Sequence, residues 1–471
     1  MTELLRPGRP RVLAAAGVVG LAAALSLGFV APAALGPYFQ IDATARLFLA
    51  LIHMVFLGIA YNVWTRLPGS EVAVEDRSFT TAWQVGLCFA FLAAADLSIL
   101  ANHFVGGWVA LEATSLAAAP LIVRPGAPSS TQASWRYFLF SSVSLSLVLL
   151  GFLCIARGMT GQGLGDLFIA PFSAEPLPRE APGSWATLGL GLIVLGYGAK
   201  LGLAPLYMWL PETYQEAPAA VTSMLAAIQF NCTLVGLIRV LQVYRVGHEA
   251  MLSGELVGLG LASLALATAS IIATTNLRRL LAYASILHGG IIAIGLGIGA
   301  GAGFGVLLYA VSNAFIKAML FLTAGKIEAQ YGTQSTTAIR GVIKGLPYSG
   351  LFLMAGTFAL LGFPPFGSFV GELLILSGLV RGGYLLTFAS VGFLVTVSFV
   401  ATGRTVFPMI WGEQDASHPG GAPPMPTLAP QTFVSFVPKL LFLVALVVLG
   451  LHLPDPVNAL FRQVAVTLGD P

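Results

Sequence analysis

Long apolar runs, each close to 20 residues and nearly free of charge, recur along almost the whole chain. Only 9% of the 471 residues are charged, against about 25% in soluble domains, and the mean hydropathy is +0.86. This composition excludes a soluble enzyme and a disordered chain. It also excludes a nucleic-acid binder, because such proteins gather their basic residues on one face. The sequence predicts an all-α polytopic membrane protein embedded in a lipid bilayer.

The apolar runs set the expected number of spans. A bilayer core of roughly 30 Å needs about 20 apolar residues per helix. On this basis residues 1–471 form a single transmembrane domain with about 13 transmembrane helices. We expect these near 12–31, 44–64, 79–98, 99–123, 135–157, 187–209, 219–241, 256–276, 280–299, 303–325, 350–380, 385–407 and 435–453.

Two of the runs contain prolines at positions that would interrupt a helix. The run 187–209 meets Pro205, and the run 350–380 contains Pro364 and Pro365. At an offset of 160 residues the two segments align, with three identities: Gly202 on Gly362, Pro205 on Pro365 and Glu212 on Glu372. Paired interrupted helices indicate inverted repeats around a midplane site. We expect repeats at about 79–241 and 256–411, flanked by helices 12–31, 44–64 and 435–453.

The loops differ in basic charge. Loops on the side of the N-terminus carry about twice as many Lys and Arg residues as those on the other side, which indicates a cytoplasmic N-terminus. We therefore expect the N-terminus in the cytoplasm and the C-terminus on the opposite side of the cell inner membrane.

Five ionisable residues lie inside or beside the predicted spans: Glu112, Lys200, His288, Lys317 and Glu372. A charge at the centre of a transmembrane helix costs about 2.5–3.5 kcal/mol, so it needs an internal partner or a water-filled path. One interpretation is a row of proton-exchanging groups with carboxylates opposite lysines. The other is a set of static ion pairs that fix helix register. Elsewhere, His53 suggests packing or a hydrogen bond between helices, and Asp96 an interfacial position at a helix end.

Redox and metal motifs are missing from the sequence. Cys88, Cys154 and Cys232 each stand alone in an apolar segment, with no CxxC pair, no metal-ligand spacing and no phosphate-binding glycine loop. We expect no cofactor, no metal and no catalytic residue in this chain.

The segments around these charges resemble a known family, the antiporter-like, proton-translocating subunits of respiratory complex I, Mrp-type cation/proton antiporters and membrane-bound hydrogenases. Within that family the chain is most similar to hydrogenase-4 component F, of the formate hydrogenlyase type. The match is carried by GGWVALEATSL, AKLGLAPLYMWLPETYQEAPAAVTSML, NLRRLLAYASILHGGIIAIGLGIG, NAFIKAMLFLTAGKI and GFPPFGSFVGELLIL. The resemblance implies two inverted five-helix repeats, each with one broken helix. It also implies that Glu112 pairs with Lys200, and that His288, Lys317 and Glu372 continue a central proton path.

The resemblance implies partners as well. These are other integral membrane subunits and peripheral iron–sulfur, hydrogenase or quinone-reductase subunits, whose electron transfer drives proton translocation. Five positions that are often ionisable in relatives are not so here: Tyr207, Tyr214, Asn231, Leu287 and Asn313. Tyr and Asn order water but do not store a proton near neutral pH. Two alternatives therefore stay open: a component of an Mrp-type cation/proton antiporter, and a degenerate scaffold subunit that does not conduct.

Overall fold

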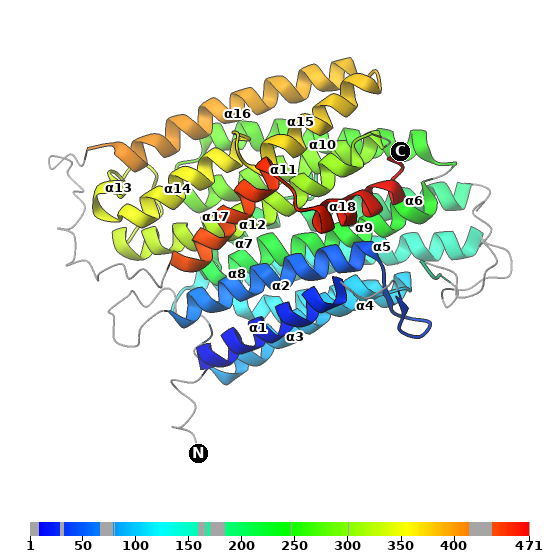
Figure 1. The fold of residues 1–471 in the computed structure, drawn as a ribbon, viewed down its shortest axis with the longest axis horizontal. Coiled ribbons are helices and arrows are strands. Elements are labelled where there is room, and N and C mark those ends of the chain that lie inside the picture. Colours follow the sequence, from blue (N-terminus) through cyan, green and yellow to red (C-terminus); the bar gives the residue numbers. More distant parts are fainter. Residues whose placement is uncertain are drawn as a thin grey trace.

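The structure is a computed structural model that describes residues 9–28, 33–65, 79, 81–158, 164, 167–169, 184–245, 247–299, 301–413 and 436–470. Nearly all of these residues are helical, and Figure 1 shows the helices side by side in one bundle. Two short strands, β1 (Ala33–Ala34) and β2 (Gln40–Ile41), pair antiparallel before the second helix. The expected all-α membrane fold is confirmed.

The helices follow the predicted apolar runs. Those of the first half are α1 (Arg9–Gly28), α2 (Ala43–Trp64), α3 (Ala82–Leu100), α4 (Phe104–Ile122), α5 (Pro128–Gly158), α6 (Ser184–Leu201), α7 (Trp209–Glu216), α8 (Ala219–Met224), the π-helical η3 (Leu225–Gln229) and α9 (Phe230–Tyr244). Those of the second half are α10 (Glu249–Ala273), α11 (Leu277–Ile298), α12 (Gly303–Tyr331), α13 (Val342–Gly345), α14 (Pro347–Leu360), α15 (Gly367–Arg381), α16 (Leu385–Trp411), α17 (Val437–Leu451) and α18 (Asp455–Thr467).

Within the described ranges, ten helices are long and apolar enough to cross a membrane, or eleven if α17 and α18, bent by 71°, form one span. Each of the predicted ranges falls on a helix or on a broken pair of helices. The total of about 13 spans and the division into inverted repeats stay predictions.

Both predicted helix breaks are present. α6 stops before Gly202, whose φ is +84°, and α14 stops before Gly362, whose φ is +66°. Protein groups take up the backbone atoms that the breaks release: Ala204 N–H donates to Ser263 Oγ at 2.9 Å, and the Ser368 hydroxyl donates to the Ala359 carbonyl at 2.6 Å. Non-helical backbone at membrane depth requires such partners.

The most enclosed helix is α12, every residue of whose most apolar stretch is buried, whereas α16 is largely exposed. Figure 1 shows α16 at one edge of the bundle and α1 and α3 at the opposite edge. Close packing brings backbones together: a Cβ on Gly260 of α10 would lie 2.7 Å from the Gly290 carbonyl of α11. Small residues allow such approach between membrane helices.

Buried ion pairs join the helix ends on one side of the bundle. Arg124, after α4, lies 3.3 Å from Glu216 of α7, and Arg278 of α11 lies 2.6 Å from Glu328 of α12. Arg124 also lies 3.7 Å from Glu328 and so connects the two pairs. Arg278, which the sequence suggests is an exposed membrane anchor, is instead buried. These contacts fix α7, the segment after the first break, against both halves of the chain.

A second ion pair secures the other side. Arg239 of α9 donates to both oxygens of Asp42, the N-cap of α2, with Nη2 at 2.8 Å from Oδ1. Burial acts to raise the pKa of Asp42, but the hydrogen bonds and charge of Arg239 outweigh it and hold the pKa below its usual value. A carboxyl whose pKa is lowered on folding stabilises the fold above its unfolded pKa and loses this contribution as the pH falls through the folded value.

We predict that Asp42→Asn lowers the free energy of unfolding at neutral pH by roughly 2 kcal/mol, between the values for exposed and fully buried pairs. The difference from wild type should shrink as the pH falls below about 4, where the wild-type carboxyl begins to protonate. Thermal unfolding of the detergent-solubilised full chain at several pH values measures this. A difference that stays constant down to acid pH would contradict the account.

The N-terminus of α12 is capped from a distant part of the chain. Ala302 offers no side-chain cap, and instead the Asp470 carboxylate accepts from the N–H groups of Gly301 (2.6 Å), Gly303 (3.0 Å) and Phe304 (2.8 Å). A carboxylate at a helix N-terminus satisfies free donors and complements the helix dipole.

We predict that Asp470→Ala lowers the free energy of unfolding by about 1 kcal/mol and Asp470→Asn by less, because the amide oxygen keeps part of the cap. The thermal unfolding midpoint is the readout, and Glu413→Gln, at an exposed position, is the control. Equal midpoints for Asp470→Ala and the control would show that the cap contributes nothing.

Candidate functional site

Lys200 occupies the last turn of α6, directly before the first helix break. Its side chain is 4% exposed, and its ammonium group donates to the hydroxyls of Ser115 on α4 and Ser141 on α5. Ser141 in turn donates to Ser115 at 3.0 Å. The charge is thus solvated by hydroxyl groups of two neighbouring helices, as a buried ammonium group requires.

Glu112 lies one turn before Ser115 on the same helix and is partly buried. Its Oε1 accepts from the Ser142 hydroxyl at 2.6 Å, while its Oε2 has no hydrogen-bond partner among the described residues. Glu112 and Lys200 lie within electrostatic range of each other, but no ion pair joins them within the described part of the chain. The adjacent residues Ser141 and Ser142 connect the two groups instead.

A further polar side chain extends this cluster towards the middle of the bundle. Gln229, the last residue of η3, donates to Thr114 Oγ1 at 3.2 Å and to Ser115 Oγ at 3.4 Å. Its Oε1 accepts from the Tyr137 hydroxyl at 2.8 Å. We call Glu112, Ser115, Ser141, Ser142, Lys200, Tyr137 and Gln229 the Lys200 cluster.

Lys317 of α12 begins a second cluster. Its Nζ lies 4.0 Å from the ring centroid of Phe230, the residue after Gln229, and has no hydrogen-bond partner among the described residues. His288 of α11 lies within electrostatic range of Lys317. Nδ1 of His288 and the hydroxyl of Tyr309 share a hydrogen bond of 2.5 Å. The Phe230 ring thus has Lys317 on its face and the Lys200 cluster one residue away.

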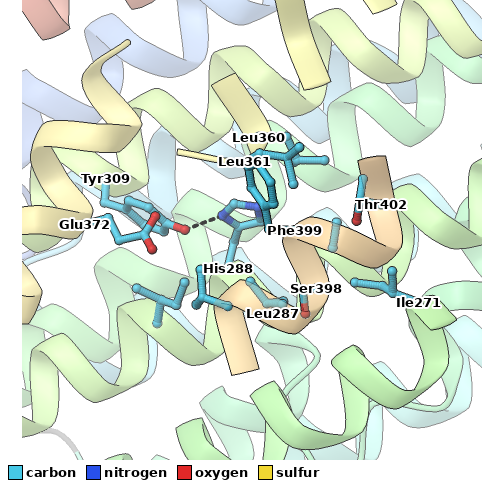
Figure 2. Close-up of a pocket in the computed structure, with 13 residues that line it drawn as sticks. Ile271, Leu287, His288, Tyr309, Leu360, Leu361, Glu372, Ser398, Phe399 and Thr402 are labelled. Carbon is cyan, nitrogen blue, oxygen red and sulfur yellow. Dashed lines mark hydrogen bonds between the residues drawn. The ribbon is translucent and has the colours of Figure 1, made fainter. Parts of the chain in front are cut away.

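Glu372 of α15 lies at the far end of this second cluster, and Figure 2 shows its carboxylate beside Tyr309. Glu372, Tyr309 and His288 face a cavity of about 20 Å³, which Ser398 and Thr402 of α16 also line. That volume admits about one water molecule. We call Lys317, His288, Tyr309 and Glu372 the Lys317 cluster.

Between the clusters, several buried polar atoms have no hydrogen-bond partner in the described part of the chain. They are Asn231 Oδ1, both amide atoms of Asn313, Ser312 Oγ and Lys317 Nζ. Buried polar atoms in proteins almost always bond to protein groups or to ordered water. The middle of the bundle is therefore suited to hold water at positions where the sequence places Asn.

The comparisons with known proteins cover most of this region. A family model described as the transmembrane region of NADH:quinone oxidoreductase and Mrp antiporter proteins matches residues 101–398, which include both clusters. The chain belongs to this family.

Individual relatives of this NADH:quinone oxidoreductase/Mrp antiporter family are distant. The chain is 28% identical over 349 residues to a hydrogenase-4 component F homolog of Methylacidiphilum infernorum, covering 73% of this chain and 72% of the relative. It is 26% identical over 345 residues to a component of the Na(+)/H(+) antiporter of Bacillus subtilis, covering 72% and 67%. A protein in the structure of an archaeal membrane-bound sulfane sulfur reductase shares the fold, with a TM-score of 0.83, 22% identity and coverage of 99% and 95%.

The family fold brings the predicted residues into two groups, Glu112 with Lys200, and His288 with Lys317 and Glu372. Tyr207 lies apart from both: it is partly buried against the hydrophobic core between α6 and α7, with no side-chain hydrogen bond to a described residue. Asn231 and Asn313 lie on α9 and α12, where their side chains are buried. In the described ranges no three His, Cys, Asp or Glu side chains are placed to hold a metal ion.

Sequence reasoning missed the hydroxyl groups that solvate Lys200. Ser115 follows Glu112 by three residues, one helical turn, which was a usable signal. Ser141 and Ser142 lie in a stretch, 141–146, that also contains Ser144 and Ser146. Nothing in that stretch distinguishes the two serines that face Lys200 and Glu112.

We predict that the double variant Ser115→Ala/Ser141→Ala reduces proton transport by roughly tenfold or more, because the Lys200 ammonium loses both hydroxyl partners and a positioned proton relay is broken. The matched control is Ser146→Ala, an exposed serine on the same helix as Ser141. Proton uptake by vesicles that contain the assembled complex measures the effect, and wild-type rates in the double variant would contradict the proposed role of the serines.

Proposed function

We propose that this chain is the proton-translocating membrane subunit of a complex I-like redox complex, of the membrane hydrogenase or NADH:quinone oxidoreductase type. The observation that carries the proposal is the arrangement of the two clusters. Each holds a buried lysine and a carboxylate, and unpartnered polar atoms of the described residues lie between them. Buried charges at membrane depth mark ion paths and proton relays.

The proposed path has a definite order. A proton bound to the Lys200 cluster passes the region of Asn231 and Asn313 through water and reaches Lys317. From there His288 and Tyr309, which share a hydrogen bond, lead to the water-sized cavity beside Glu372. Glu112 controls the affinity of Lys200 for its proton through charge, because an opposite charge nearby favours the protonated amine.

The energy source lies outside this chain in the proposal. The solved structures that share the fold include subunits of multi-subunit membrane complexes. We propose that neighbouring integral membrane subunits and peripheral iron–sulfur, hydrogenase or quinone-reductase subunits carry the electron transfer, with no cofactor in this chain. The loop charges support a location in the cell inner membrane with a cytoplasmic N-terminus and the C-terminus opposite.

A second candidate is cation/proton antiport, which the similarity to the Na(+)/H(+) antiporter component of Bacillus subtilis supports. In that function a sodium gradient alone would move protons. A redox-driven subunit would instead move protons only when its complex is supplied with an electron donor.

We predict that Lys200→Ala and Lys317→Ala each reduce the protons moved per electron pair by roughly tenfold or more, while electron transfer by the partner subunits continues. The complex is purified with this chain tagged and reconstituted in vesicles, and pH change and donor oxidation are recorded together. Lys344→Ala, at an exposed position of α13, is the control.

Two other outcomes would overturn the proposal. Normal proton transport in both variants would indicate a non-conducting scaffold. Proton movement that requires sodium and no electron donor would indicate an antiporter.

A further inference from the structure

A third pair of titratable side chains lies outside both clusters. His53, at the midpoint of α2, and Asp96 of α3 form an ion pair, with Nε2 2.9 Å from Oδ1. The His53 side chain is 8% exposed and that of Asp96 is 29% exposed. The sequence treats the two separately, His53 as packing or an inter-helix hydrogen bond and Asp96 as interfacial. The structure makes them one buried site that the proposed path does not use.

The imidazole of this pair has one nitrogen available. An ionised carboxylate only accepts hydrogen bonds, so Nε2 of a neutral His53 carries the hydrogen and Nδ1 holds the lone pair. Nδ1 is buried and has no hydrogen-bond partner among the described residues. It faces Gly20 of α1, where a Cβ would lie only 2.5 Å away. A basic nitrogen is therefore enclosed by three helices, with a glycine leaving the space beside it.

The pair is also connected to Lys200. Cys232 of α9 lies within electrostatic range of both Asp96 and Lys200, and it contacts Ser98, which lies two residues after Asp96 on α3. Cys232 and Ser98 line one cavity of about 20 Å³, room for about one water molecule. The neighbouring helices thus contribute Cys232 and Lys200 as titratable groups near the pair, and α1 contributes Gly20.

The two directions away from Lys200 differ in chemistry. Towards Lys317 the next side chains are the Phe230 ring and the Asn231 amide, neither of which holds a proton. Towards α3 a carboxylate and an imidazole lie beyond Cys232 and Ser98. A group that stores a proton near neutral pH is therefore found on the lateral side.

We propose that His53 and Asp96 form a second proton-exchange site of the Lys200 cluster, reached laterally past Cys232 and Ser98; this rests on the proposed function. In the exchange the Lys200 ammonium gives up one proton and becomes a neutral amine. His53 binds a proton at Nδ1 and becomes an imidazolium, and Asp96 stays ionised and stabilises the new positive charge. Because Asp96 is partly exposed at the edge of the bundle, the site links Lys200 with the α1–α3 face.

The test uses the assembled complex in vesicles, with proton transport and donor oxidation recorded together. We expect Asp96→Asn and His53→Gln each to lower proton transport by roughly tenfold, because a positioned acid–base group is lost. Gly20→Ala should do the same without removing a titratable group, since its methyl group would fill the space beside Nδ1. Controls are His452→Gln and Asp455→Asn, both at exposed positions.

A chemical probe gives a second readout. Dicyclohexylcarbodiimide reacts with membrane carboxyl groups that take up a proton, and peptide mass spectrometry locates the label. We expect label on Asp96, increased in His53→Gln because the carboxylate then lacks its imidazolium partner. Absence of label on Asp96 in both forms of the complex would count against proton exchange at this pair.

The outcomes separate this site from the proposed function. Wild-type transport in Asp96→Asn and Gly20→Ala, in preparations where Lys200→Ala is inactive, would overturn the lateral site and leave the proposed function standing. Wild-type transport in Lys200→Ala would overturn both. A variant that fails to assemble with the complex is replaced by the other two, and Gly20→Ala then decides.

Discussion

The solvation of Lys200 by Ser115 and Ser141 is the interaction on which the site depends. An ammonium group inside an apolar bundle is expensive unless donors and acceptors surround it, and here two hydroxyl groups from α4 and α5 supply acceptors. The same two helices carry Glu112 and its partner Ser142. Because Lys200 lies at the end of α6, directly before the Gly202 break, the position of its charge and the position of the break are set together.

The breaks therefore serve the site rather than the packing alone. Each ends a helix near the middle of the bundle and places a charged residue beside it, Lys200 before the first break and Glu372 after the second. Glu372 lies so close to Gly362 that a Cβ there would be 2.7 Å from its Oε2. The ion pair of Arg124 with Glu216 holds the end of α7, so that the interrupted helix has a fixed position.

The sequence was sufficient to predict the class of fold and both breaks, and it singled out the five ionisable residues that the structure places in two clusters. These features depend on hydropathy, on Gly and Pro, and on charges that are rare in apolar runs, all of which are visible in one dimension. It was not sufficient for contacts between distant helices. The link from Glu112 to Lys200 through Ser141 and Ser142 depends on which face of α5 turns inwards, and helix faces of similar composition do not reveal that. His53 and Asp96 were missed as a pair for the same reason, because they are 43 positions apart on different helices.

The central claim is that water connects the two clusters past Phe230. The most direct test is cryo-electron microscopy of the assembled complex at a resolution that shows ordered water. The account predicts water bonded to Asn231 Oδ1, to the Asn313 amide and to Lys317 Nζ, the atoms that have no partner in the described part of the chain. A dry gap, in which side chains of this chain or of a neighbouring subunit satisfy those atoms directly, would contradict it.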